Sequence, residues 1–253
     1  MMRAPLVAPS VLFVLLLAGC AELLPSQDTA GLPEYGATAT PAPPPAKAVD
    51  AATVDAAVAA ADSLVRSVSP RDGDVRAAGR RLALEDGGDA VDAGHTTLSG
   101  FCGRTMGSDE HRVARHRVQV LAAGGTSPSY LGVEVVAYES DTWARRALAE
   151  WRDAIEDCEL GRDVDVLGVA VRYYSAAQRR NDRLPVADNA VGTSVTGAEA
   201  TGVKQTVYQI LQRRGAVLSI VVAMGEPKPS AADRSQAQRL AKVVGNRLAK
   251  LRA

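Results

Sequence analysis

The chain has 253 residues with 29 basic and 29 acidic side chains, so its formal net charge at pH 7 is zero. A balanced charge gives no general attraction to nucleic acid or anionic lipid, and we expect no nucleic-acid partner. Aromatic residues make up only 4% of the chain, which argues against large stacking platforms for sugars or bases. The length is sufficient for one sizeable domain or two small ones.

The N-terminus has the pattern of a bacterial export signal. Arg3 supplies a positive charge, and residues 11–18 form an unbroken apolar run. The run closes in Leu17-Ala18-Gly19-Cys20, which resembles the lipobox of bacterial lipoproteins. The resemblance implies cleavage before Cys20 and attachment of diacylglycerol to its thiol.

A membrane-spanning helix is the alternative interpretation of this segment. Such a helix needs about 20 apolar residues, whereas Pro5, Pro9 and Ser10 leave far fewer. We therefore expect residues 1–19 to be a signal peptide. The mature chain would then be held by its N-terminal lipid on the extracytoplasmic face of the cell membrane.

Residues 20–48 are rich in proline, alanine, threonine and glycine. This composition cannot bury a core, and it indicates a disordered or polyproline-like tether. As a flexible coil, the tether would span roughly 30 Å and hold the folded part clear of the bilayer. We expect residues 49–253 to form a single folded domain.

The domain opens with an amphipathic helix, predicted from apolar residues at helical spacing that stop before Ser69-Pro70. The predicted buried stripe is Val54, Val58, Ala61, Val65 and Val68. Glycines make residues 71–110 hard to interpret, and a short helix near residues 74–84 is one possibility.

Alternation of polar and apolar residues predicts a half-buried strand over residues 112–122. One of its faces carries Ala114, His116, Val118 and Val120, and the other carries Arg115, Arg117 and Gln119. A turn over residues 124–129 leads to a second predicted strand over residues 131–138.

A helix capped by Ser140 or Asp141 is predicted to run to about Asp157. Its buried stripe comprises Trp143, Ala147, Trp151, Ala154 and Ile155. We expect the two tryptophans to belong to the core, with a ligand cage as the alternative.

The remaining elements are predicted as one or two strands over residues 164–174, a strand over residues 190–196, a hairpin and a final helix. Gly215 supplies the positive φ that the hairpin turn needs. Ser230 and Asp233 form a capping box at the start of the last helix. This order predicts an α+β fold, with a mainly antiparallel sheet covered by helices.

Cys102 and Cys158 remain as an even pair once Cys20 is lipidated. In an oxidising compartment we expect them to form a disulfide. A reactive thiol or a metal pair is the alternative, but the chain has no Cys-x-x-Cys spacing and no nearby histidine pattern to support it.

The search for catalytic motifs is mostly negative. Residues 192–196 contain the first half of a nucleophile elbow without its closing glycine. His111 and His116 are five residues apart, which on a strand places them on opposite faces and argues against a shared metal ion. We predict no catalytic residue, no metal site and no cofactor.

His116 lies on the apolar face of its strand and is the first candidate for lining a ligand site. A core histidine bonded to the backbone is the alternative. Arg112, Arg115 and Arg117 form a basic strip whose default interpretation is a solvated face, with anion binding as the minority one. If a cleft exists, we expect it near His116, Arg115 and Arg117.

From about residue 100 onward, several segments occur in a familiar order: Phe101-Cys102, the strand from Gly132, the tryptophan helix ending in Cys158, Leu184 to Gly192, and the hairpin around Tyr208. This order resembles the extracellular sensor domain of the mycobacterial serine/threonine kinase PknH and its stand-alone lipoprotein relatives. The resemblance implies an antiparallel sheet with helices on one side and a cleft suspected of binding a ligand. It supplies no catalytic residue, and this chain lacks the cysteines for the second disulfide of that domain.

Three functions are open at this point. The leading one is a membrane-anchored, non-enzymatic lipoprotein that binds or senses a small-molecule or envelope-protein ligand. The second is a structural lipoprotein that docks to a partner in the envelope. The third is an envelope enzyme with an unrecognised site.

A cavity with convergent polar groups would favour the first function, and an exposed apolar patch would favour the second. Clustered titratable groups with perturbed pKa values would favour the third.

Overall fold

The computed structural model describes residues 51–85, 88–89, 100–122, 129–166, 169–198 and 203–251. The predicted signal peptide, tether and lipid-attachment residue Cys20 lie outside these residues, as does most of the predicted turn over residues 124–129. The folded unit comprises Ala48–Ala253. Among the described helices, none has the length and apolar character needed to cross a membrane.

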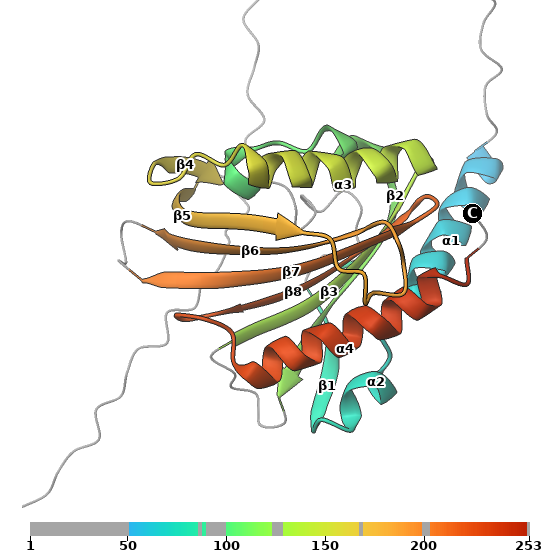
Figure 1. Cartoon of the computed structure of the whole chain (residues 1–253). Coiled ribbons are helices and arrows are strands. Elements are labelled where there is room, and N and C mark those ends of the chain that lie inside the picture. Colours follow the sequence, from blue (N-terminus) through green and yellow to red (C-terminus); the bar gives the residue numbers. More distant parts are fainter. Residues whose placement is uncertain are drawn as a thin grey trace, which may run out of the picture. The chain divides into compact units, whose positions relative to one another are not determined.

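Eight strands form one sheet in the order β1-β2-β3-β8-β7-β6-β5-β4 (Figure 1). Every neighbouring pair of strands is antiparallel. The strands are β1 (Arg80–Leu84), β2 (Arg112–Ala122), β3 (Ser129–Tyr138), β4 (Asp163–Val166), β5 (Val169–Arg179), β6 (Asn189–Ala198), β7 (Lys204–Arg214) and β8 (Val217–Gly225). The expected α+β class is confirmed.

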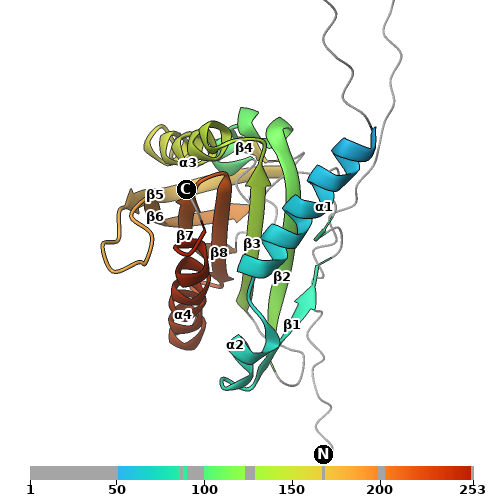
Figure 2. The ribbon, with the colours of Figure 1, turned by 90° about the vertical axis from the view of Figure 1, so that its right-hand side faces the viewer.

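Helices cover both faces of the sheet, so the expectation of helices on one side is wrong. The α-helices are α1 (Ala51–Val68), α2 (Asp72–Arg76), α3 (Asp141–Glu156) and α4 (Ala231–Leu248), and η1 (Phe101–Gly103) and η2 (Gly107–His111) are short 3-10 turns. Neighbouring residues of β7 show the division, because Ile210 packs in the core formed with α1 and α4, whereas Leu211 packs in the core formed with α3. Figures 1 and 2 show α3 and α4 on opposite sides of the strands.

The tryptophan helix forms as predicted. The Ser140 hydroxyl accepts a hydrogen bond from the backbone N–H of Trp143 and caps α3. Trp151 is fully buried, and its indole N–H donates to Gln209 Oε1 at 3.2 Å. Gly192 of β6 makes room for this ring, because a Cβ atom at that position would lie 2.6 Å from the indole. Overpacking of that kind is costly in a dense core.

The C-terminal hairpin and helix also match the prediction. Gly215 adopts a φ of 55° in the turn between β7 and β8. Ser230 caps α4, with its hydroxyl accepting from the backbone N–H of Asp233 at 3.0 Å. The apolar face of α4 is buried through Ala237, Leu240, Val244 and Leu248.

Two predictions near the start of the domain need correction. The possible helix over residues 74–84 is a single turn, α2, followed by strand β1, because Leu82 packs on the core while β1 pairs with β2. In α1, Val65 and Val68 are buried as expected, but Val54 and Val58 are each 47% exposed. Among the described residues, only the second half of the predicted stripe therefore belongs to the core.

The expected disulfide joins Cys102 in η1 to Cys158 just after α3, with the two Cα atoms 5.3 Å apart. Phe101, next to this bond, packs against Trp151 and Tyr173. The disulfide thus fastens the segment before β2 to the end of α3, over one half of the sheet.

Candidate functional site

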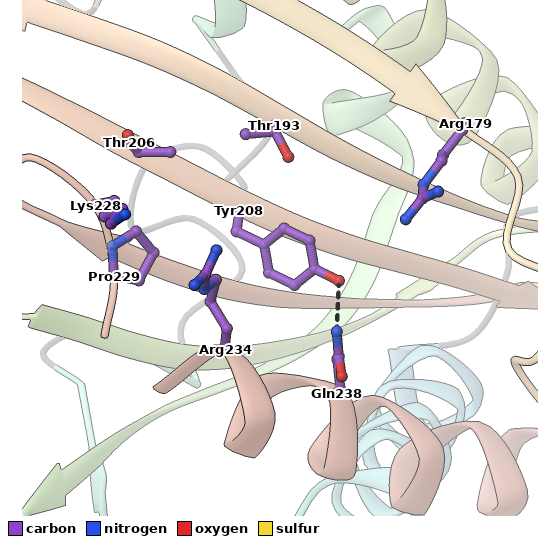
Figure 3. Close-up of a pocket in the computed structure, with 8 residues that line it drawn as sticks. All are labelled: Arg179, Thr193, Thr206, Tyr208, Lys228, Pro229, Arg234 and Gln238. Carbon is purple, nitrogen blue, oxygen red and sulfur yellow. Dashed lines mark hydrogen bonds between the residues drawn. The ribbon is translucent and has the colours of Figure 1, made fainter. Parts of the chain in front are cut away.

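A pocket of about 330 Å³ lies where β5, β6 and β7 face the start of α4 (Figure 3). Eight residues from these elements and from the loop before α4 line it: Arg179, Thr193, Thr206, Tyr208, Lys228, Pro229, Arg234 and Gln238. Seven of the eight side chains are polar, and Arg179, Thr193 and Gln238 are among those open to solvent.

The strand register assembles the floor of the pocket. Tyr208 is opposite Thr193, and Arg179 is opposite Val191, in adjacent antiparallel pairs. Side chains alternate between the two faces of a strand, so Tyr208 shares its face with Ile210, which packs beneath α4. The same alternation that buries the core beneath α4 therefore turns polar side chains toward the start of this helix.

Helix α4 and the loop before it form the wall. Arg234 and Gln238 are four residues apart and lie on one side of the helix. The Gln238 amide donates to the Tyr208 hydroxyl at 3.5 Å, and the Thr206 hydroxyl donates to the carbonyl of Pro227 at 2.5 Å. These two bonds join the floor of the pocket to its wall and to the loop that carries Lys228.

The pocket is positively charged. Arg179, Lys228 and Arg234 line it together, and none of the described residues that line it carries a carboxylate. Within the described parts of the chain, none of these three cations forms an ion pair.

The carboxylates nearest in sequence are engaged elsewhere. Asp233 binds Arg80 at 2.6 Å and Ser230, and Glu226 accepts from Gln205 at 2.8 Å. Burial would raise the pKa of Asp233, but the hydrogen bonds from Ser230 and Arg80 outweigh it and hold this pKa below its ordinary value. Asp233 is therefore ionised at neutral pH, and its charge is directed at Arg80.

The described residues that line the pocket include no histidine, cysteine, aspartate or glutamate, the side chains that most often act as general bases or metal ligands. Over the described residues generally, no group of three or more such side chains is arranged to hold a metal ion. Ser194 lies in the middle of β6 and is paired on both sides, so the strand-to-helix turn of a nucleophile elbow is not formed there.

The residues expected to line a cleft lie elsewhere in the sheet. His116 shares a face of β2 with Val118, which packs with α1 and α4, and Arg115 and Arg117 point to the opposite face. The three side chains therefore do not converge on one cavity. A ligand role for each of them stays a prediction, and the pocket at α4 is built from other residues.

His116 is largely buried beside Asp89, with its Nε2 atom 3.8 Å from that carboxylate. Asp89 in turn binds Arg66 of α1 at 3.0 Å. Burial is the main cause that lowers the pKa of His116, and the attraction to Asp89 only partly opposes it. The ring is therefore neutral at pH 7.

The basic strip is not a solvated face, which corrects the default interpretation. The side chains of Arg115 and Glu134 are 2% and 1% exposed, and Arg115 Nε lies 2.9 Å from Glu134 Oε1. Arg117 pairs with Glu85, which also accepts a hydrogen bond from Tyr130. Burial raises the pKa of Tyr130, and Glu85 adds to the effect. Carboxylates thus neutralise both arginines.

Both tryptophans pack in the core beneath α3, as expected, but to different depths. Trp151 is fully buried, whereas Trp143 packs against that core from a partly exposed position. Its ring stacks on His111, with ring centroids 3.4 Å apart. The guanidinium of Arg146 also lies over Trp143, at 5.1 Å from the ring centroid. His111 is the last residue of the turn η2, directly before β2.

The pocket at α4 was not among the sites predicted from the sequence. Its cations come from β5, the loop after β8 and α4, which are far apart in sequence. One signal was present: Thr193, Thr206 and Tyr208 place polar groups on the strand face whose neighbouring positions are apolar core. Polar residues on a core-facing side indicate that part of that face is uncovered.

Comparison with solved structures gives a distant likeness. No protein-family model and no curated protein sequence matches the chain. A similar solved structure is the extracellular domain of PknH from Mycobacterium tuberculosis, with 13% sequence identity and a TM-score of 0.46. The match covers 74% of this chain and 97% of that one.

Proposed function

We propose that this chain is a lipid-anchored extracytoplasmic protein whose folded domain binds a ligand in the pocket at α4 and catalyses no reaction. The observation that carries the binding role is the pocket itself, where polar side chains from β5, β6, β7 and α4 converge. Convergent polar groups in a concave site are the usual mark of a ligand site.

The location rests on two independent features. The lipobox-like segment ending in Cys20 follows an apolar run of signal-peptide type. The Cys102–Cys158 bond fits the same compartment, because structural disulfides persist in oxidising environments and are rare in the cytosol. The proline-rich residues 20–48 precede the folded domain and would hold it away from the membrane.

Cys20→Ser tests the anchor. We expect the variant to be released from the membrane fraction or to accumulate as an uncut precursor, because the thiol is the attachment point for the lipid and two acyl chains anchor a protein where one is marginal. Cell fractionation and intact mass measure both outcomes, and Cys158→Ser is the control that should stay anchored. Full processing and unchanged membrane retention of Cys20→Ser would contradict the anchor.

Ligand retention tests the binding role. Native mass spectrometry of the full chain, purified from its own host in mild detergent, is expected to show a bound small molecule. Thr193→Trp fills the pocket and should abolish the bound mass, whereas Thr142→Trp, at an exposed position of α3, should retain it. Protein without any adduct, or an adduct that Thr193→Trp retains, would contradict binding in this pocket. Turnover of an envelope substrate that one point mutation abolishes would contradict the non-enzymatic role.

A further inference from the structure

The arrangement of charge in the pocket at α4 indicates the chemical class of the proposed ligand. Figure 3 shows Arg179 and Lys228 at opposite ends of the pocket with Tyr208 between them, and Arg234 rising from α4 on the same side as Gln238. Positive charge is therefore distributed along the whole site rather than at one edge of it.

These cations contrast with the rest of the domain. Most arginines in the described residues pair with carboxylates, as Arg213 does with Asp188 and Arg247 with Asp74. Arg179, Lys228 and Arg234 form no such pair among the described residues, although they share one pocket. Like charges gathered without counter-charges repel one another, so the free pocket carries an electrostatic cost that an anion would relieve.

Arg234 adds to this cost. It stands in the fourth position of α4, close to the positive end of the helix dipole, where an anionic side chain is favoured and a cationic one is not. Its neighbour Asp233, which does suit that position, is turned to Arg80 and is buried. The local charges therefore do not stabilise Arg234 in the free protein.

The neutral groups indicate what else the ligand carries. Thr193, Tyr208 and Gln238 offer hydroxyl and amide groups that can both donate and accept hydrogen bonds. A volume of about 330 Å³ is at the small end for ligand sites, which suits a small molecule or a headgroup rather than a length of polymer.

We infer that the pocket binds a phosphomonoester attached to a hydroxyl-bearing group, as a free small molecule or as a lipid headgroup. A phosphomonoester carries about −1.5 to −2 charge at pH 7. A site with several cations therefore matches a phosphomonoester better than it matches a single carboxylate. Arginine binds the phosphoryl oxygens through paired N–H groups, and lysine adds a point charge. The inference rests on the proposed binding function and names its ligand class.

The test uses the full chain in zwitterionic detergent and isothermal titration calorimetry. Glycerol 3-phosphate is the soluble probe, with glycerol as its uncharged control. Dioctanoyl phosphatidic acid presents the same phosphomonoester as a lipid, with dioctanoyl phosphatidylcholine as its control. Binding of glycerol 3-phosphate would identify a free ligand, and binding of the phosphatidic acid alone would identify a headgroup; either result supports the inference.

Variants connect the binding to the pocket. Arg179→Gln, Lys228→Gln and Arg234→Gln are each expected to weaken binding by about tenfold, the loss of one charge-assisted hydrogen bond. Arg81→Gln on β1 and Lys242→Gln further along α4 remove the same charge from exposed positions outside the pocket and should leave the affinity unchanged. Added salt should weaken binding in the wild-type chain.

Failure of this inference is distinct from failure of the proposed function. Binding of neither phosphate probe, equal binding of the uncharged controls, or equal losses in the Arg81→Gln and Arg234→Gln variants would overturn the phosphomonoester assignment. A phosphorus-free adduct retained from the host and lost in Thr193→Trp would also overturn it, while leaving the binding function intact. The absence of any retained ligand, or an adduct that Thr193→Trp retains, would count against the proposed binding function as well.

Discussion

Arg115→Met is expected to lower the free energy of unfolding by about 3–5 kcal/mol, because it leaves the Glu134 carboxylate buried without its main counter-charge. The two side chains are 2% and 1% exposed, so water cannot replace the lost partner. Chemical denaturation of the wild type and the variant at neutral pH measures the difference.

The matched control for this substitution is Arg145→Met. Arg145 pairs with Asp141 at the surface, with side chains 66% and 44% exposed, and such pairs contribute about 0.5 kcal/mol or less. Arg115→Met/Glu134→Leu should recover most of the stability, since removing both charges leaves none uncompensated. Equal, small losses in Arg115→Met and Arg145→Met would show that the buried pair is solvated in the folded protein.

Removing the disulfide is expected to cost about 4 kcal/mol. Cys102 and Cys158 are 56 residues apart, and closing a loop of that length restricts the unfolded chain by about this amount on the chain-entropy model. Cys102→Ser/Cys158→Ser should therefore unfold at a markedly lower denaturant concentration than the wild type.

A reductant provides the control for the cysteine variant. It should lower the unfolding midpoint of the wild-type protein and leave that of Cys102→Ser/Cys158→Ser unchanged, because only the former has a bond to lose. Peptide mapping without reduction should find the Cys102–Cys158 crosslink. Two thiols that can be alkylated in the native protein, or a midpoint that the reductant does not move, would contradict a structural role for this bond.

Local patterns in the sequence were sufficient for most elements. Alternation along residues 112–122 predicted β2 with its observed bounds, and the glycine in the turn predicted the β7–β8 hairpin. Caps at Ser140 and Ser230 located the starts of α3 and α4. Each of these signals lies within a few residues of the structure it determines, so no tertiary information was needed.

Features that depend on distant partners could not be predicted in the same way. Arg115 and Arg117 looked like a solvated strip because Glu134 and Glu85, which neutralise them, lie on other segments. Likewise, Arg179 and Arg234 lie together in the pocket at α4 only because of the strand order, which the sequence pattern does not show. The predicted cleft near His116 relied on one strand, and side chains on opposite faces of a strand cannot share a cavity.

The strand order also constrains how the domain is completed. Strands β1 to β3 form one run of neighbours, β4 to β7 form another, and β8 lies between β3 and β7. A chain emerging N-terminus first could build either run from local pairings, but the two halves have no hydrogen-bonded junction until the last strand arrives. The junction between the two halves of the sheet is thus formed by β8, and α4, which forms one side of the pocket, follows β8 in the chain. A chain with this strand order that crosses a membrane in extended form would therefore complete the pocket at α4 only after β8 and α4 have been delivered.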